Sequence, residues 1–165
     1  MTQRINDKHT YPQGVEDLFK IYTTTEWIPK RYEGIGMRNV SVQKCEQQGE
    51  TWNVWTSREV KAQLPRALSK FAQDWNTLTQ KETWTRKGES YECDISVDIS
   101  GLPVGVLGHM VVQTHQGGSA NIIELNVRCD IPLLGRKVEK FVAGDTAKSI
   151  KQEYAWIQDF LNTNS

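Results

Sequence analysis

The sequence has no charge excess of either sign and no long apolar run. Lys+Arg and Asp+Glu both number 20 in 165 residues, so the formal net charge is zero. A general nucleic-acid binder needs a basic excess to offset phosphate charge, so this balance argues against a nucleic-acid partner. No stretch approaches the roughly 20 apolar residues of a membrane span, so stable membrane insertion is not expected. Local basic patches and transient membrane contact remain compatible with the sequence.

Cysteine and histidine are also scarce. The three cysteines, Cys45, Cys93 and Cys129, lie far apart without CxxC spacing, which is typical of reduced thiols in a cytoplasmic protein. His109 and His115 would lie about 20 Å apart along one strand, too far to share a metal ion. The N-terminal segment shows no apolar run of a signal peptide. We therefore expect a soluble cytoplasmic protein with no metal site and no cofactor.

Signature motifs of catalysis are missing as well. The sequence contains no GxSxG, no GxGxxG and no P-loop, and nothing in it places a nucleophile beside a base. No catalytic residue can therefore be assigned. What the chain does contain is ordinary globular material, with 38% hydrophobic and 24% charged residues. Its length suits a single domain over residues 1–165.

The apolar pattern changes its period along the chain, which predicts an α+β domain. Residues 3–11 read as a short opening strand, and residues 15–36 carry apolar groups at the spacing of two short helices. The period then becomes two, which indicates about six strands in antiparallel hairpins. Their turns are expected near 48–49, 87–88 and 117–118.

A long helix over 131–161 closes the chain. In the strand over 91–99 the odd-numbered residues are apolar and the even-numbered ones polar, so one sheet face is dry and must be covered. At about 1.5 Å per residue, some 28 helical residues span roughly 42 Å, which is enough to cross a strongly curved sheet. The terminal helix is therefore the expected cover.

This helix carries polar groups in the middle of its apolar face. The face begins apolar at Val138 and Phe141 and then presents Asp145, Ser149 and Gln152. Against a solid core, such groups cost several kcal/mol unless each finds a hydrogen-bond partner. Two explanations stay open: the polar groups face a ligand in a cavity, or the helix changes its packing face at the glycine before Asp145.

The segment between the second and third predicted hairpin strands interrupts the strand pattern. Leu64, Leu68 and Phe71 stand there at helical spacing among basic residues. They could form a mobile lid or a membrane-touching loop that admits a lipid, or an amphipathic connector packed on the sheet end.

Neighbouring residues on one strand should face opposite sides of the sheet. One of the adjacent pair Arg58 and Glu59 should therefore point inward, where a partner such as Asp145 would be needed. Trp52 and Trp55 likewise cannot share a face unless a bulge intervenes. Plain packing and the lining of an apolar pocket both explain such tryptophans.

Three stretches in this order resemble a known superfamily: "HTYPQGVEDLFKIYTTTEWIPKRYEGIG", "QLPRALSKFAQDWNTLTQKETW" and "IPLLGRKVEKFV". They are similar to the opening, the central segment and the entry into the closing helix of the START-like superfamily. This superfamily is also called birch-pollen-allergen-like, SRPBCC or helix-grip. The likeness is to an uncharacterised bacterial family within it and covers nearly the whole chain. It implies a curved seven-stranded antiparallel sheet wrapped around the long helix, with a cavity between them. It implies no particular ligand and no catalytic residue.

The preferred hypothesis is noncatalytic binding or transport of a hydrophobic small molecule, namely a lipid, a fatty acid or an aromatic or polyketide-like metabolite. The alternatives are a cyclase- or hydratase-like enzyme acting on a similar ligand, and a protein-interaction module. The sequence does not set the oligomeric state. The candidate cavity residues are Trp84, Tyr91, Ile95, Val97, Leu125, Val127, Val138, Phe141 and Asp145, and the lid candidates are Leu64, Leu68 and Phe71.

Overall fold

A computed structural model describes residues 2–61, 64–71 and 73–164 of the chain. Its elements follow one another in the order β1 (Gln3–Tyr11), α1 (Val15–Thr23), α2 (Trp27–Glu33), β2 (Arg38–Gln48), β3 (Thr51–Lys61), the 3-10 helix η1 (Arg66–Phe71), β4 (Trp75–Lys87), β5 (Ser90–Ile99), β6 (Val104–His115), β7 (Gly118–Cys129) and α3 (Gly135–Thr163). No helix in the described part of the chain is long and apolar enough to cross a membrane.

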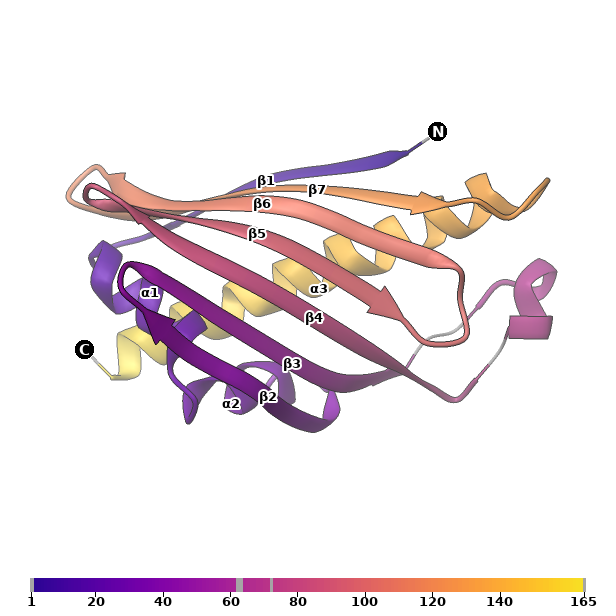
Figure 1. The fold of residues 1–165 in the computed structure, drawn as a ribbon, viewed down its shortest axis with the longest axis horizontal. Helices are drawn as coiled ribbons and strands as arrows, with labels where there is room; N and C mark the ends of the chain where they lie inside the picture. The colour runs from indigo at the N-terminus through magenta and orange to yellow at the C-terminus, as the bar shows by residue number, and fades with distance from the viewer. Residues whose placement is uncertain (1, 62–63, 72, 165) are drawn as a thin grey trace.

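The seven strands form one antiparallel sheet in the order β1-β7-β6-β5-β4-β3-β2 (Figure 1). The tight turns include Gly49, Gly88 and Gly117, which lie within the predicted turn positions, and each of these glycines has the positive φ that a two-residue hairpin turn demands. The opening strand β1 pairs with the last strand β7, so the two halves of the chain meet at one sheet edge. The predicted α+β helix-grip fold is confirmed.

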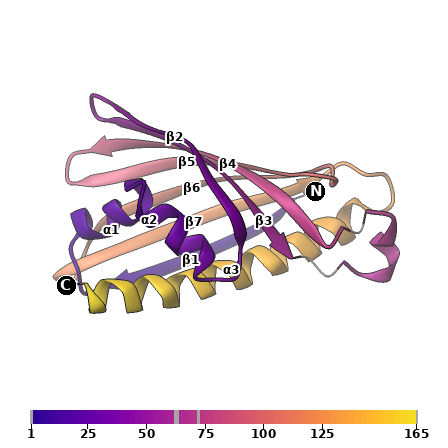
Figure 2. The same cartoon turned by 90° about the horizontal axis from the view of Figure 1, so that it is seen from below.

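Helix α3 runs along the inner face of the curved sheet, and α1 and α2 cover the same face near the C-terminal end of α3 (Figures 1 and 2). The helix begins at Gly135, four residues later than the predicted start. Leu133 explains the difference, because its φ of 67° lies in the left-handed region and cannot continue a right-handed helix. Gly135 itself lies so close to the end of β7 that a Cβ there would come within 2.6 Å of the Cys129 carbonyl oxygen.

One end of the inner face is filled by aromatic rings. Phe19 of α1 stacks on Tyr91 with ring centroids 3.6 Å apart. Its edges meet Trp52 and Trp84 in T-shaped contacts at 4.9 and 5.5 Å. Offset or edge-to-face pairs of this kind add stability beyond the buried area alone. This end of the domain is therefore a solid core, and the space between sheet and helix opens only beyond it.

Candidate functional site

Between the concave sheet face and α3 lies a cavity of about 360 Å³. This volume lies within the range of roughly 300–1,000 Å³ that is typical of small-molecule sites. One wall is apolar and comes mainly from the alternating strands β5–β7 and from α3. The residues of this wall are Ile95, Val97, Ile99, Val106, Ile123, Leu125, Phe141 and Val142.

Five of the nine residues proposed from the sequence lie in the cavity lining: Ile95, Val97, Leu125, Phe141 and Asp145. The other four, Trp84, Tyr91, Val127 and Val138, are fully or almost fully buried elsewhere. Trp84 and Tyr91 belong to the aromatic core around Phe19, because α1 occupies the end of the groove that they face. Strand alternation correctly gives the face of a side chain, but it does not say where along that face the helices stop filling the space.

Of the three lid candidates, Leu64 and Leu68 lie away from the described cavity lining. Leu68 is completely buried, and Leu64 is partly buried against the same hydrophobic core. The side chain of Phe71 falls outside the described part of the chain. The completely buried Leu68 on this short 3-10 helix favours the packed connector over the mobile lid.

The polar groups of α3 face the cavity. Asp145, Ser149 and Gln152 all line it. The pKa of Asp145 is raised because the surrounding protein partly desolvates its carboxyl group, and Lys148 nearby opposes the rise. The helix α3 continues unbroken through Gly144, and its polar patch forms part of the cavity wall.

A buried ion pair crosses the polar wall. The Arg31 guanidinium of α2 is 1% exposed, and its Nε lies 3.1 Å from Oε1 of Glu153 on α3. This is a charge–charge contact and not an aligned hydrogen bond. The same guanidinium lies over the rings of Tyr22 and Tyr32, at 4.7 Å from each centroid. These contacts join α2 to α3 across the interior.

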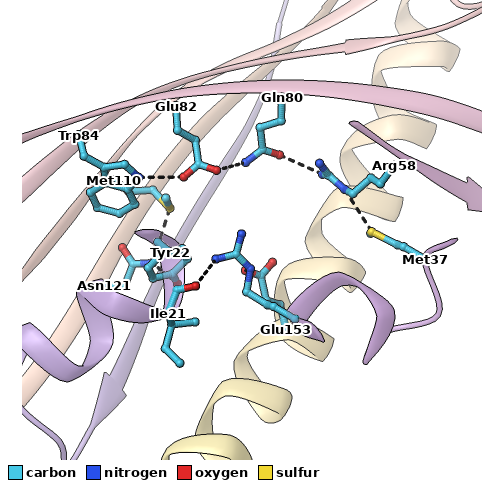
Figure 3. Close-up of polar contacts among 11 residues, drawn as sticks. Ile21, Tyr22, Met37, Arg58, Gln80, Glu82, Trp84, Met110, Asn121 and Glu153 are labelled. Carbon is cyan, nitrogen blue, oxygen red and sulfur yellow. Dashed lines mark hydrogen bonds and ion pairs between the residues drawn. The ribbon is translucent and has the colours of Figure 1, made fainter. Parts of the chain in front are cut away.

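A second polar chain runs along the inner face of β3 and β4 (Figure 3). Arg58 Nη2 donates to Oε1 of Gln80 at 2.9 Å, and Gln80 Nε2 donates to Oε2 of Glu82 at 2.8 Å. Trp84 Nε1 donates to the other oxygen of Glu82 at 2.9 Å. Burial raises the pKa of the Glu82 carboxyl, while Arg31 and these two donors act in the opposite direction.

Of the adjacent charges on β3, Arg58 faces inward and Glu59 outward. Glu59 accepts hydrogen bonds from the side chains of Arg38 and Asn39 on the outer side. The suggested partner of the inward charge was Asp145, but the described contacts of Arg58 are with other groups, Gln80 among them. The alternation argument thus required one of the two charges to face inward, but it named neither which one nor its partners.

The sequence reading missed the polar stripe of β4, namely Asn76, Gln80 and Glu82. Residues of both parities are polar in this strand, so alternation hides which set faces inward. The turn at Gly88 carries the missing signal. Counting back from it pairs Glu82 with Ile95 and Gln80 with Val97, and directly paired residues share a face.

Replacing Glu82 by glutamine is expected to change how stability depends on pH. The folded-state pKa of Glu82 lies above the ordinary value of 4.5. The protonated carboxyl group therefore contributes fully to the free energy of unfolding below pH 4.5, and this contribution is lost as the pH rises through the folded-state pKa. A glutamine cannot ionise and escapes this loss. The stability of the variant relative to the unmodified protein should therefore increase as the pH rises above 4.5 and through the folded-state pKa. Urea unfolding across this range measures it, and a difference independent of pH contradicts the prediction.

Within the described residues, no group of three or more His, Cys, Asp and Glu side chains could hold a metal ion. The described cavity wall is built from apolar, hydrogen-bonding and charged side chains. Such a wall can hold an apolar molecule and orient polar groups on it.

Solved structures share this fold at low sequence identity. The protein TTHA0849 from Thermus thermophilus is 12% identical with a TM-score of 0.66, over 99% of this chain and 100% of that one. A putative uncharacterised protein from Rhizobium leguminosarum is 8% identical with a TM-score of 0.63, over 99% and 96%. Ara h 8.0201 is 14% identical with a TM-score of 0.56, over 95% and 98%. At these identities the similarities show the helix-grip fold alone.

At the level of sequence, residues 7–161 match a family described as "Protein of unknown function (DUF2505)". A comparison with curated proteins found no match.

Proposed function

We propose a function for this chain, which belongs to the DUF2505 family of unknown function. It binds or transports a hydrophobic small molecule in its internal cavity without chemical change. The cavity between the sheet and α3 is the observation that carries this proposal. An empty apolar cavity forfeits dispersion contacts and lowers stability, so larger side chains would be favoured there if the space had no use.

The shape of the lining describes the kind of molecule that would fit. The strands β5–β7 supply an apolar wall, while α2, α3, β3 and β4 supply polar groups. Apolar burial, at about 25 cal/mol per Å², would provide most of the affinity, and the polar groups would fix orientation. The volume lies near the lower end of the usual range, which favours a single-chain lipid, a fatty acid or a ring-sized aromatic or polyketide-like metabolite over a two-chain lipid.

A second function, a cyclase- or hydratase-like enzyme on a similar ligand, is favoured by Glu82. Its carboxyl group is 1% exposed, lines the cavity and has a raised pKa. A buried carboxyl with a raised pKa is suited to donating or accepting a proton near neutral pH. Binding remains the preferred function because both carboxylate oxygens of Glu82 already accept hydrogen bonds from the protein.

An interaction module has less support. It would use a contiguous exposed apolar patch. The large apolar side chains that are exposed in the described part of the chain are Leu107 on β6 and Leu133 in the loop before α3, and these belong to different segments.

The binding proposal is tested with N-phenyl-1-naphthylamine, a neutral apolar dye that fluoresces on leaving water. Val106→Trp fills the cavity from β6, whereas Leu107→Trp adds the same ring on the exposed face of the same strand. We expect Val106→Trp to weaken dye binding about tenfold or more and Leu107→Trp to leave it unchanged. Native mass spectrometry with solvent extraction should find an apolar molecule that Val106→Trp no longer retains. A protein that binds neither dye nor any co-purifying molecule contradicts the proposal.

A further inference from the structure

We propose that Arg58 anchors a single carboxylate on the cavity ligand, so that the protein selects apolar monocarboxylates. This inference rests on the proposed binding function and names the ligand class for the same cavity.

The hydrogen-bonding state of Arg58 is the first observation. Its guanidinium is 6% exposed and lines the cavity. Nη2 donates to Gln80, and Nε lies 3.2 Å from the sulfur of Met37 (Figure 3). The central carbon of the guanidinium lies 4.1 Å from the ring centroid of Tyr32. All three partners are neutral, and the buried Nη1 has no hydrogen-bond partner among the described residues.

The other buried arginine of this cavity provides the contrast. Arg31 is also buried, at 1% exposure, but its Nε lies 3.1 Å from the carboxylate of Glu153. A buried cation is stable only when it is paired and hydrogen-bonded, and a guanidinium is suited to planar recognition of a carboxylate. Arg31 therefore has its anion inside the protein, whereas Arg58 lacks one within ion-pair distance in the described part of the chain. A carboxylate on the ligand would supply the anion that Arg58 lacks.

The neighbours of Arg58 suit both ends of such a ligand. Asn76 is its diagonal neighbour across the β3–β4 ladder, is 1% exposed, and has a side-chain oxygen without a described partner. The side-chain amide of Asn76 can rotate by half a turn, which lets its NH₂ group donate a hydrogen bond to the second carboxylate oxygen. On the other side, Arg58 pairs with Leu78 of β4, and Leu78 pairs with Ile99 of β5, which belongs to the apolar wall. The head group would lie at β3 and the apolar body against β5–β7.

The charges of the lining favour one negative charge over two. The described lining contains four basic side chains, Arg31, Arg58, Lys61 and Lys148, and three acidic ones, Glu82, Asp145 and Glu153. Glu153 neutralises Arg31, and Lys148 lies close enough to Asp145 to act on its pKa. Glu82 sits one glutamine away from Arg58 and would repel a dianion. A carboxylate therefore fits this site better than a phosphate.

The test uses three ten-carbon probes that compete with bound N-phenyl-1-naphthylamine: decanoate, 1-decanol and decyl phosphate. In the unmodified protein at neutral pH, decanoate should displace the dye at a concentration about tenfold or more below that of 1-decanol. Decyl phosphate should compete less well than decanoate. Arg58→Gln should abolish the advantage of decanoate over 1-decanol, so that the two displace the dye at similar concentrations.

Arg128→Gln is the matched control, because it removes an exposed guanidinium paired with Asp130 and should keep the advantage of decanoate. If Arg58→Gln does not fold by circular dichroism, Arg58→Met, which retains the apolar length of the side chain, takes its place. Equal displacement by decanoate and 1-decanol, or an advantage that survives in both Arg58 variants, overturns the assignment. Stronger displacement by decyl phosphate overturns the choice of carboxylate. Failure of the dye to bind at all counts against the proposed function itself and is thereby distinguished.

Discussion

Glu153→Leu is expected to lower the free energy of unfolding by about 3–5 kcal/mol. The substitution leaves the Arg31 guanidinium, which is almost completely buried, without its carboxylate at 3.1 Å. Removing one member of a buried pair costs far more than the pair contributes, because the remaining charge stays desolvated. The contacts of Arg31 with two tyrosine rings and with the Ile21 carbonyl oxygen remain, and they hold the cation in place without neutralising it.

Urea unfolding followed by circular dichroism measures the effect. Asp130→Asn is the matched control, since it breaks the exposed pair with Arg128 and should cost less than about 1 kcal/mol. The double variant Arg31→Met/Glu153→Leu should recover much of the lost stability, because it removes the stranded charge. A Glu153→Leu effect as small as that of the control would show that Arg31 is solvated through the cavity.

Phe19→Ala, as a separate variant, is also expected to lower the free energy of unfolding by about 3–5 kcal/mol. Phe19 is almost completely buried and holds together the rings of Tyr91, Trp52 and Trp84. Removing it opens a void in the solid end of the domain, where α1 closes the groove. Unlike the main cavity, this void has rigid aromatic walls that cannot relax to fill it.

Thermal and urea unfolding check the loss, and Leu133→Ala serves as the control because its side chain is fully exposed. Phe19→Ala also tests whether the aromatic cluster lies outside the ligand site. If the aromatic cluster is structural, Phe19→Ala should leave the affinity for the neutral dye within about twofold in the folded protein. A loss of dye binding as large as that from Val106→Trp would place the aromatic cluster in the ligand site.

The fold could be predicted from sequence because its signals are local. The strand β5 alternates cleanly from Tyr91 to Ile99, and the hairpin turns carry glycines with positive φ. The long helix follows from its period and from the near absence of breakers after its head, where Gly144 is the exception. The predicted helix start was wrong by the four residues of the loop before Gly135. Leu133 in this loop has a left-handed backbone, which leucine does not favour and which the sequence therefore does not predict.

The candidate site was predictable on its apolar side and hidden on its polar side. Ile95, Val97 and Leu125 lie on strands where apolar and polar residues alternate, so their face could be read directly. Gln80 and Glu82 lie on β4, where both faces are polar and the pattern is silent. Arg58 could be assigned to one of two faces, but its partners come from α2, β4 and the segment before β2.

The sequence by itself determined the class of fold, the order of its elements and the face of each alternating strand, because these depend on period and turn chemistry within a few residues. Only the tertiary structure decided where the inner face is solid and where it is hollow. That depends on how far α1 reaches along the groove and on side chains that meet from distant parts of the chain. The pairing of Arg31 with Glu153, which leaves Arg58 with neutral partners, is such a result: no spacing in the sequence distinguishes the two arginines.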